Sequence, residues 1–298
     1  MARTINVIQQ EMLTRITADE NLAGLNTTSK TAIWRLMVFV VAFSIWVLEN
    51  LFDTHKKEVN DIIEAKMPHR PSWYRTKALA FQYGFDLLTA RNEFGLLEDT
   101  DKFDNTGYTP EQIEASKVIK YAAVTKSGGQ LFIKIATETA GVLAPIAPEV
   151  KTAFVAYMDD VADCGVKYLV VNHLPDRLIL GMQIYRNPLV LKEFGMDIRT
   201  AKYPVEDAIK AYMKQLPFNG ELVLAHLVDK LQQVEGVVIT HIYNATFQAI
   251  DISTGLYNAP ELIDVKTVPV AGYFDVGSIN ESTGEFESGN FSSVSYVV

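Results

Sequence analysis

Apolar residues gather in one segment near the start of the chain and continue beyond it as a helical stripe. No charged residue stands between Arg35 and Glu49. After Glu49 the apolar residues recur at helical steps, at Phe52, Val59, Ile62 and Ile63. The pattern predicts one helix from a cap near Ser29 to about Met67, ended by the prolines of "MPHRP". Because its first half is apolar on all sides, we expect its own chain or other subunits to cover it.

Helical spacing on both sides extends this segment into an N-terminal helical module, residues 1–90. Upstream, "ARTINVIQQEMLTRITADENL" predicts a shorter amphipathic helix. Downstream, "SWYRTKALAFQYG" predicts another helix, with Gly84 as its stop. Residues 91–108 contain turn residues and mixed charge, which predict a connecting loop.

The middle third, residues 109–190, alternates strands with short helices. "TPEQ" at Thr109–Gln112 has the form of a capping box with proline at the first helical position. Two strand-like runs flank the turn Ser127–Gly129, and an amphipathic helix follows Pro148. "VKYLVV" and "DRLILGMQIY", joined by "NHLPD", predict an antiparallel pair. This order of elements is typical of a small α+β sandwich.

The last third repeats the mixture of helices and strands in residues 191–275. Helices are predicted at about 204–216 and 221–234, followed by the strand "VVITHI" and a strand pair in "LIDVKTVPVAGYFDV". Residues 276–298 have little apolar content and predict an exposed arm. The predicted fold class is therefore α+β, with an N-terminal long-helix module followed by two small α+β sandwich modules.

Charge and cysteine content narrow the classes of function. The net charge of −9 argues against nucleic acid as a partner, because such binders neutralise phosphates with clustered lysine and arginine. The one cysteine, Cys164, excludes an intramolecular disulfide framework, and we expect it to pack as a small apolar side chain. The uncharged run is shorter than the roughly 20 residues that span hydrocarbon, so membrane insertion is not expected.

Candidate chemical groups are few and scattered. His226 and Asp229 share one helical face, and Asp159, Asp160 and Asp163 lie close together in "MDDVAD". We expect His226 to lie at the edge of a packed helix beside a solvated Asp229. We expect the three other aspartates to be solvated surface groups, not ligands of a metal ion. "KSGGQ" is expected to be a hairpin turn, and no Walker loop, GxGxxG or GxSxG motif occurs. We predict no catalytic, metal-binding or cofactor-binding residues and no cofactor.

A series of motifs carries a resemblance to a known family. A "FVAYMDD" helix, strands, "PVEDAIKAYM", a glycine turn, "LVLAHLVDKLQQVEGV" and a strand follow one another over about residues 154–242. This succession resembles the baseplate J-like family of contractile-tailed phages and related injection machines. The positions that match the family pattern are Val205, Ala208, Ile209, Tyr212, Gly220, Val223, Leu227, Leu231, Val234, Gly236 and Val237.

The resemblance implies a structural subunit of a phage tail baseplate, a wedge or ring component around the tail hub. Its partners would be other copies of itself and neighbouring wedge or hub proteins, and its place would be the virion. The long helix would then supply an interface of Trp34, Met37, Val38, Val40, Val41, Ile45, Trp46, Leu48, Phe52 and Val59. The alternatives are an unrecognised metal- or nucleotide-dependent enzyme and a peripheral membrane protein that uses the apolar helix.

Overall fold

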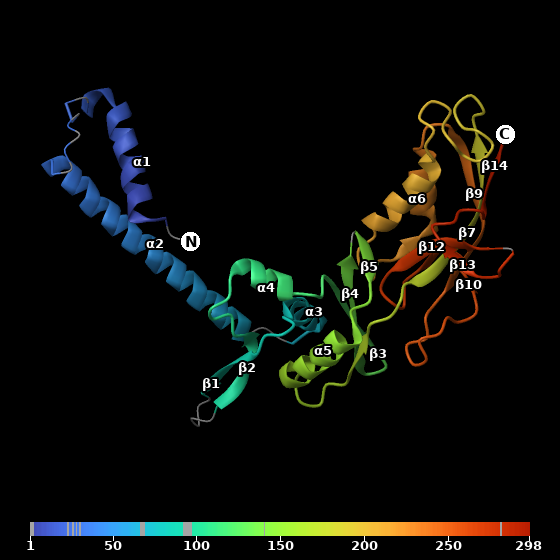
Figure 1. Cartoon of the computed structure of the whole chain (residues 1–298), viewed down its shortest axis with the longest axis horizontal. Helices are drawn as coiled ribbons and strands as arrows, with labels where there is room; N and C mark the ends of the chain where they lie inside the picture. Colours follow the sequence, from blue (N-terminus) through green and yellow to red (C-terminus); the bar gives the residue numbers. More distant parts are fainter. Residues whose placement is uncertain are drawn as a thin grey trace. The chain divides into compact units, whose positions relative to one another are not determined.

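A computed structural model shows two compact units, residues Met1–Pro68 and His69–Val298 (Figure 1). The structure describes residues 3–22, 24, 25, 27, 29, 31–65, 69–91, 97–139, 141–280 and 282–298. The fold is a mixture of helices and sheets, which confirms the predicted α+β class. The predicted helical module of residues 1–90 is wrong at its end, because Trp73, Tyr74 and Phe81 are buried in a core of the second unit.

The first unit is a helical hairpin. It consists of α1 (Ile5–Ala18), the short 3-10 helix η1 (Glu20–Leu22) and α2 (Ile33–Ala65). Thr4 caps α1, because its hydroxyl accepts a hydrogen bond from the amide of Val7 at 3.4 Å. The predicted long helix is present and begins at Ile33 instead of near Ser29. Its predicted end at Met67 lies outside the described residues.

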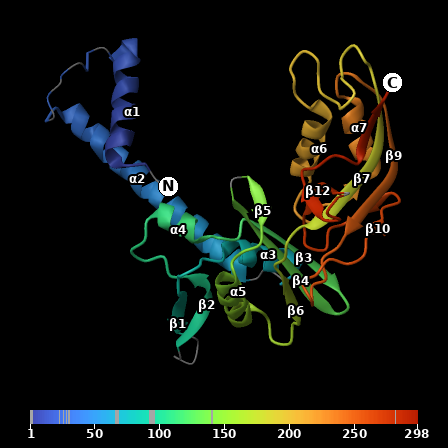
Figure 2. The same ribbon diagram turned by 45° about the vertical axis from the view of Figure 1, so that its right-hand side comes forward.

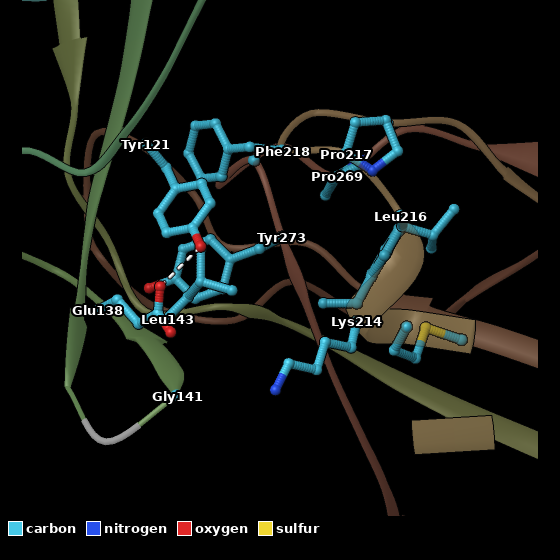
Figure 3. Close-up of a pocket in the computed structure, with 14 residues that line it drawn as sticks. Tyr121, Glu138, Gly141, Leu143, Lys214, Leu216, Pro217, Phe218, Pro269 and Tyr273 are labelled. Atoms are coloured by element: carbon cyan, nitrogen blue, oxygen red, sulfur yellow. Dashed lines mark hydrogen bonds between the residues drawn. The ribbon is translucent and has the colours of Figure 1, made fainter. Parts of the chain in front are cut away.

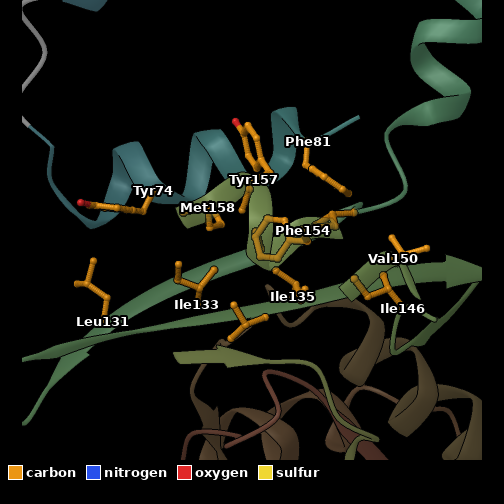
Figure 4. Close-up of a cluster of buried hydrophobic side chains, with 14 of the residues drawn as sticks. Tyr74, Phe81, Leu131, Ile133, Ile135, Ile146, Val150, Phe154, Tyr157 and Met158 are labelled. Atoms are coloured by element: carbon orange, nitrogen blue, oxygen red, sulfur yellow. The ribbon is translucent and has the colours of Figure 1, made fainter. Parts of the chain in front are cut away.

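The first half of the second unit is a four-stranded sheet covered by helices. Strand β4 lies between its neighbours, pairing with β3 and β5 antiparallel and with β6 in parallel. Helices α3 and α5 bury their apolar side chains against this sheet (Figure 4). The elements are α3 (Pro71–Ala80), α4 (Pro110–Ser116), β3 (Tyr121–Ser127), β4 (Gln130–Thr139), β5 (Val142–Ala144), α5 (Pro148–Val161) and β6 (Tyr168–Val171).

The connecting loop predicted for residues 91–108 is wrong in part, because residue 91 and residues 97–103 belong to two paired strands. Strand β1 (Leu87–Arg91) pairs antiparallel with β2 (Leu97–Phe103). The ring of Phe103 stacks on Tyr157 with centroids 5.0 Å apart and meets Phe81 edge-on at 6.1 Å. These aromatic contacts hold the hairpin against the core. The mixed charge of the segment gives no sign of this packing in the sequence.

The second half is a six-stranded sheet with two helices on one face (Figure 2). Its strands follow the order β10-β9-β7-β12-β13, and β14 pairs with the same edge of β7 as β12 does, farther along β7 and also in parallel. Strands β8 (Leu222–Val223) and β11 (Lys266–Thr267) form a separate pair. The remaining elements are β7 (Asp176–Arg186), α6 (Pro204–Gln215), α7 (Leu224–Gln232), β9 (Val237–Gln248), β10 (Glu261–Leu262), β12 (Phe274–Ile279), β13 (Phe286–Ser288) and β14 (Val294–Val297).

The predicted antiparallel pairing of "VKYLVV" with "DRLILGMQIY" is wrong, because the two strands belong to different sheets. Asn172, which follows β6, exchanges two hydrogen bonds with the backbone of Ile146 and so holds β6 in the first half. Asp176 opens β7 and accepts hydrogen bonds from backbone amides of the second half, those of Ile250, Val270 and Ala271. The boundary between the halves therefore lies at residues 172–176 and not at the predicted residue 190.

The predicted exposed arm, residues 276–298, is instead part of the six-stranded sheet. Strands β12, β13 and β14 all belong to this sheet. Val294 and Ser278 are buried, and the hydroxyl of Ser278 bonds to the carbonyl oxygen of Asn290 at 3.0 Å. Phe291 and Tyr296 pack on the core as well. Few side chains need to be apolar here, because the backbone supplies the pairing.

Candidate interaction surface

Helix α1 covers only one stripe of α2. The residues that the two helices bury between them are small or apolar, namely Ile8 on α1 and Val38 and Ala42 on α2. Val38 and Ala42 are four residues apart, which places both on the same side of the helix. The rest of the circumference of α2 is left to other contacts.

An ion pair at one end of the hairpin fixes how far α1 reaches along α2. The guanidinium of Arg3 contacts the Glu49 carboxylate, with one nitrogen to oxygen distance of 3.0 Å, and the main-chain nitrogen of Arg3 lies 2.9 Å from the same carboxylate. Arg3 also contacts Glu11 at 2.6 Å. The hydrogen bond from Arg3 holds the pKa of Glu49 below its ordinary value. Since Arg3 precedes α1, the hairpin contact ends near Glu49.

The ten residues predicted as an interface are divided by this packing. Val38 is buried in the hairpin, so its place is inside the unit and not on its surface. Trp34, Ile45 and Trp46 are half-buried. The other six are exposed, and Met37 and Phe52 each expose 64% of their surface. These six are Met37, Val40, Val41, Leu48, Phe52 and Val59.

The prediction missed a second group of exposed apolar residues on α2. They lie just before the uncharged run, within it or in the stretch that follows it, and the signal that reveals them is the apolar character of the helix on every side. The group consists of Ile33, Leu36, Phe39, Phe43, Val47, Leu51, Ile62 and Ile63. Monomeric soluble proteins rarely expose large contiguous apolar patches, so α2 is a candidate surface for contacts.

A heptad seam runs the length of α2. Steps of four and three residues alternate without interruption along nine positions, the spacing that lets two or more helices supercoil. Eight of the nine positions are apolar, and His55 is the polar one. The seam consists of Trp34, Val38, Val41, Ile45, Leu48, Phe52, His55, Val59 and Ile62. From Leu48 to Ile62 every seam residue is exposed.

The length and composition of α2 also meet the requirements of a membrane span. Residues Ile33–Asn60 are long and apolar enough to cross a bilayer, and little of this stretch is buried within the structure. Inside a bilayer the ion pair of Arg3 with Glu49 would have to be accommodated at the end of the uncharged run.

The candidate chemical groups take part in structural contacts or face solvent. His226 and Asp229 are exposed on α7, as expected. Asp163 accepts a hydrogen bond from Tyr74 at 3.0 Å and pairs with the Nδ1 atom of His69 at 2.7 Å, which lowers its pKa. Among the residues that the structure describes, no three histidine, cysteine or acidic side chains are placed to hold a metal ion. The prediction that Cys164 is packed is wrong, because it lies exposed in the turn after α5.

Three glycines, Gly128, Gly129 and Gly277, have structural roles. Gly128 and Gly129 both adopt positive φ angles, 59° and 79°, between β3 and β4, so "KSGGQ" is the predicted hairpin turn. Gly277 lets β12 approach β13, because a Cβ atom there would lie 2.1 Å from the carbonyl oxygen of Glu287. Neither the Gly128–Gly129 pair nor Gly277 lies in a phosphate-binding loop before a helix.

A small cavity lies where the two halves of the second unit meet (Figure 3). It encloses about 100 Å³. Tyr121, Phe218 and Tyr273 line it with aromatic rings, and the Tyr121 hydroxyl donates a hydrogen bond to Glu138 at 2.6 Å. The aromatic contacts join β3 to the turn after α6, and we assign the cavity to the packing of the halves.

The surface of α2 thus stands out as the candidate functional site. It combines an exposed apolar face with a regular seam, whereas the candidate chemical groups of the second unit are engaged locally or solvated. Compared with known proteins, the chain matches no protein-family model and no curated protein.

Proposed function

We propose that the chain is a structural subunit of a phage tail baseplate, a wedge or ring component around the tail hub. It would act through a helix bundle built on α2 and through contacts of the second unit with neighbouring copies. The partners of α2 would be helices of a second copy or of a neighbouring wedge or hub protein. The motifs over about residues 154–242 motivate the baseplate assignment, and the structure of α2 supports the mode of action.

The observation that carries the proposal is the part of the heptad seam from Leu48 to Ile62, where every seam residue is exposed. Burying a leucine, isoleucine, valine or phenylalanine side chain contributes about 1.5–3 kcal/mol, so several exposed residues on one helix can hold a permanent assembly together. Beyond Glu49, where the contact with α1 ends, the seam still continues through Phe52, Val59 and Ile62. A helix that continues its apolar stripe past its own hairpin partner supports a partner from another chain.

The separation into two units supports the same role. All the residues of the three buried cores belong to residues 69–298, and the α1–α2 hairpin is a compact unit of its own. A hairpin that forms a separate unit is suited to bind a different chain. The second unit would then be free to make the contacts of the ring.

The test is the assembly of tail particles from a phage genome that carries Leu48→Asp. A buried, unpaired carboxylate in the seam should abolish baseplates in negative-stain electron micrographs. The matched control is Thr54→Asp, which adds the same charge to an exposed position of α2 outside the seam and should leave particles intact.

Two results would overturn the proposal. One is normal particles with Leu48→Asp, since α2 would then hold nothing essential in place. The other is flotation of the purified full chain with lipid vesicles together with its absence from tail particles, which would favour the membrane function.

A further inference from the structure

One end of the six-stranded sheet consists of three strands only. There β14 and β9 lie on opposite sides of β7, and their residues are level with one another. Ser295 is paired with Gln183, which is paired in turn with His241. Since β14 runs parallel to β7 and β9 runs antiparallel to it, the two outer strands point in opposite directions.

Both outer edges of this three-stranded end are open. Strand β10 pairs with β9 only at Thr246 and Phe247, so no strand that the structure describes lies beside residues 238–244. Likewise β14 pairs only with β7 among the described strands. Two rows of backbone amide and carbonyl groups therefore face outward.

Neither edge carries charged residues or proline, and the two bulges of β9 lie on either side of residues 239–242, the stretch that is level with β14. Natural proteins protect open edges with charged side chains, proline or bulges that twist the edge away. The sequences "VVITHIYNATFQ" of β9 and "VSYV" of β14 contain no proline, lysine, arginine or acidic residue. The bulges of β9 against β7 leave Val238, Ile239 and Tyr243 more than half exposed.

The sheet face above these edges is open as well. Met182, Ile184, Val294 and Tyr296 point toward α6 and α7 and pack in the core. The alternate residues point to the other face, where Tyr185 and Ile239 form an exposed cross-strand pair. Figure 2 shows both helices on one side of the sheet, so the opposite side is available to a partner.

We propose that the open edge of β14 in one copy pairs antiparallel with the open edge of β9 in a second copy. Each chain carries one β14 edge and one β9 edge, and both are uncharged. The two strands are level with one another and run in opposite directions, which is the geometry that a head-to-tail repeat requires. The sheets of successive copies would join into one, with backbone hydrogen bonds across every subunit boundary. This contact rests on the proposed function, and it would be the surface through which neighbouring copies meet in the ring.

Disulfide trapping tests the contact in the full chain. The starting variant is Cys164→Ser, which removes the exposed native thiol. Onto it Ser295→Cys is combined with His241→Cys, or with Ile239→Cys or Tyr243→Cys to cover neighbouring registers; Ser295 and the three β9 positions are exposed. Within one chain Ser295 and His241 are two strand spacings apart, about 10 Å, which is too far for a disulfide. A bond must therefore join two chains.

Oxidised samples are run on a denaturing gel without reductant, which removes any association through α2. We expect at least one pair to give a ladder of dimers and higher oligomers that reductant abolishes, whereas each single-cysteine variant stops at a dimer. The contact is overturned if all three pairs give no more than their single-cysteine controls while far-UV circular dichroism shows an intact fold.

Tail particles separate this inference from the proposed function. Particles that assemble normally but show no crosslink between copies would overturn the edge contact and leave the baseplate function standing. A ladder from a chain that never enters particles would do the reverse. A ladder in both samples supports both.

Discussion

The amine of Lys134 on β4 donates a hydrogen bond to the side-chain oxygen of Asn219 at 2.6 Å, joining the two halves of the second unit. It also donates to the carbonyl oxygen of Pro269 at 2.6 Å. Burial lowers the pKa of Lys134, and the nearby Asp176 carboxylate opposes that shift. A cation therefore holds the halves together from an interior position.

Removing this cation should destabilise the second unit. Lys134→Met keeps much of the side-chain volume but leaves the buried carbonyl oxygen of Pro269 and the half-buried side-chain oxygen of Asn219 without their donor, which should lower the free energy of unfolding by about 1–3 kcal/mol. Urea denaturation of residues 69–298 measures the difference. Lys126→Met, at an exposed position of the neighbouring β3, is the matched control and should change little. Equal stability of the two variants would contradict a joining role for Lys134.

The hydrogen bond between His69 and Asp163 predicts a pH dependence. Because the bond holds the pKa of Asp163 below its ordinary value, the unfolded chain takes up the proton at higher pH than the folded one. The stabilisation is thus fully present above about pH 4 and is lost as pH falls through the lowered pKa. Melting temperatures of residues 69–298 should fall less steeply on acidification in Asp163→Asn than in the natural sequence, with an N-terminal tag to keep His69 from the chain end.

The contact of Arg3 with Glu49 predicts how firmly α1 is held. In Arg3→Ala, α1 loses the tie at its N-terminal end, and its amides should exchange with deuterium faster than in the natural sequence. Arg15→Ala is the control, since Arg15 lies at the other end of the same helix. High salt should reproduce part of the effect, because it screens exposed ion pairs. Unchanged exchange would show that Ile8 alone holds the hairpin.

The histidine of the seam predicts a trade between stability and specificity. His55→Leu completes the apolar seam and should raise the melting temperature of the α2 assembly, since a polar residue in a seam fixes register at a cost in stability. Thr54→Leu, outside the seam, should leave it unchanged. A lower melting temperature in His55→Leu would mean that His55 makes a required contact with the partner.

Local signals in the sequence predicted local structure well. Thr109 and Gln112 exchange the two hydrogen bonds of a capping box, and Gly128 with Gly129 makes the predicted turn. Such features depend on a few adjacent residues, so spacing is enough to identify them. The long helix was predicted for the same reason, because its period of apolar residues is local.

Pairing between distant strands could not be predicted in this way. The continuous apolar run of Tyr168–Val171 fits any neighbouring strand, and the side chains of Asn172 and Asp176 decide which sheet each strand joins. The apolar run of α2 predicted a covered helix, but nothing in its spacing showed that α1 would take the stripe containing Val38. The sequence therefore predicted that α2 is a helix, but it predicted only some of the residues that α2 exposes.

The two open edges of the sheet, at β14 and β9, differ from one another, so the proposed row of subunits has a β14 edge free at one end and a β9 edge free at the other. A copy whose β14 edge is blocked still accepts the β14 edge of a neighbour through its intact β9, and growth stops there. Small amounts of such a copy, mixed with the natural chain, would inhibit ring assembly out of proportion to their number. A copy blocked at both edges would not join the row and would not inhibit assembly.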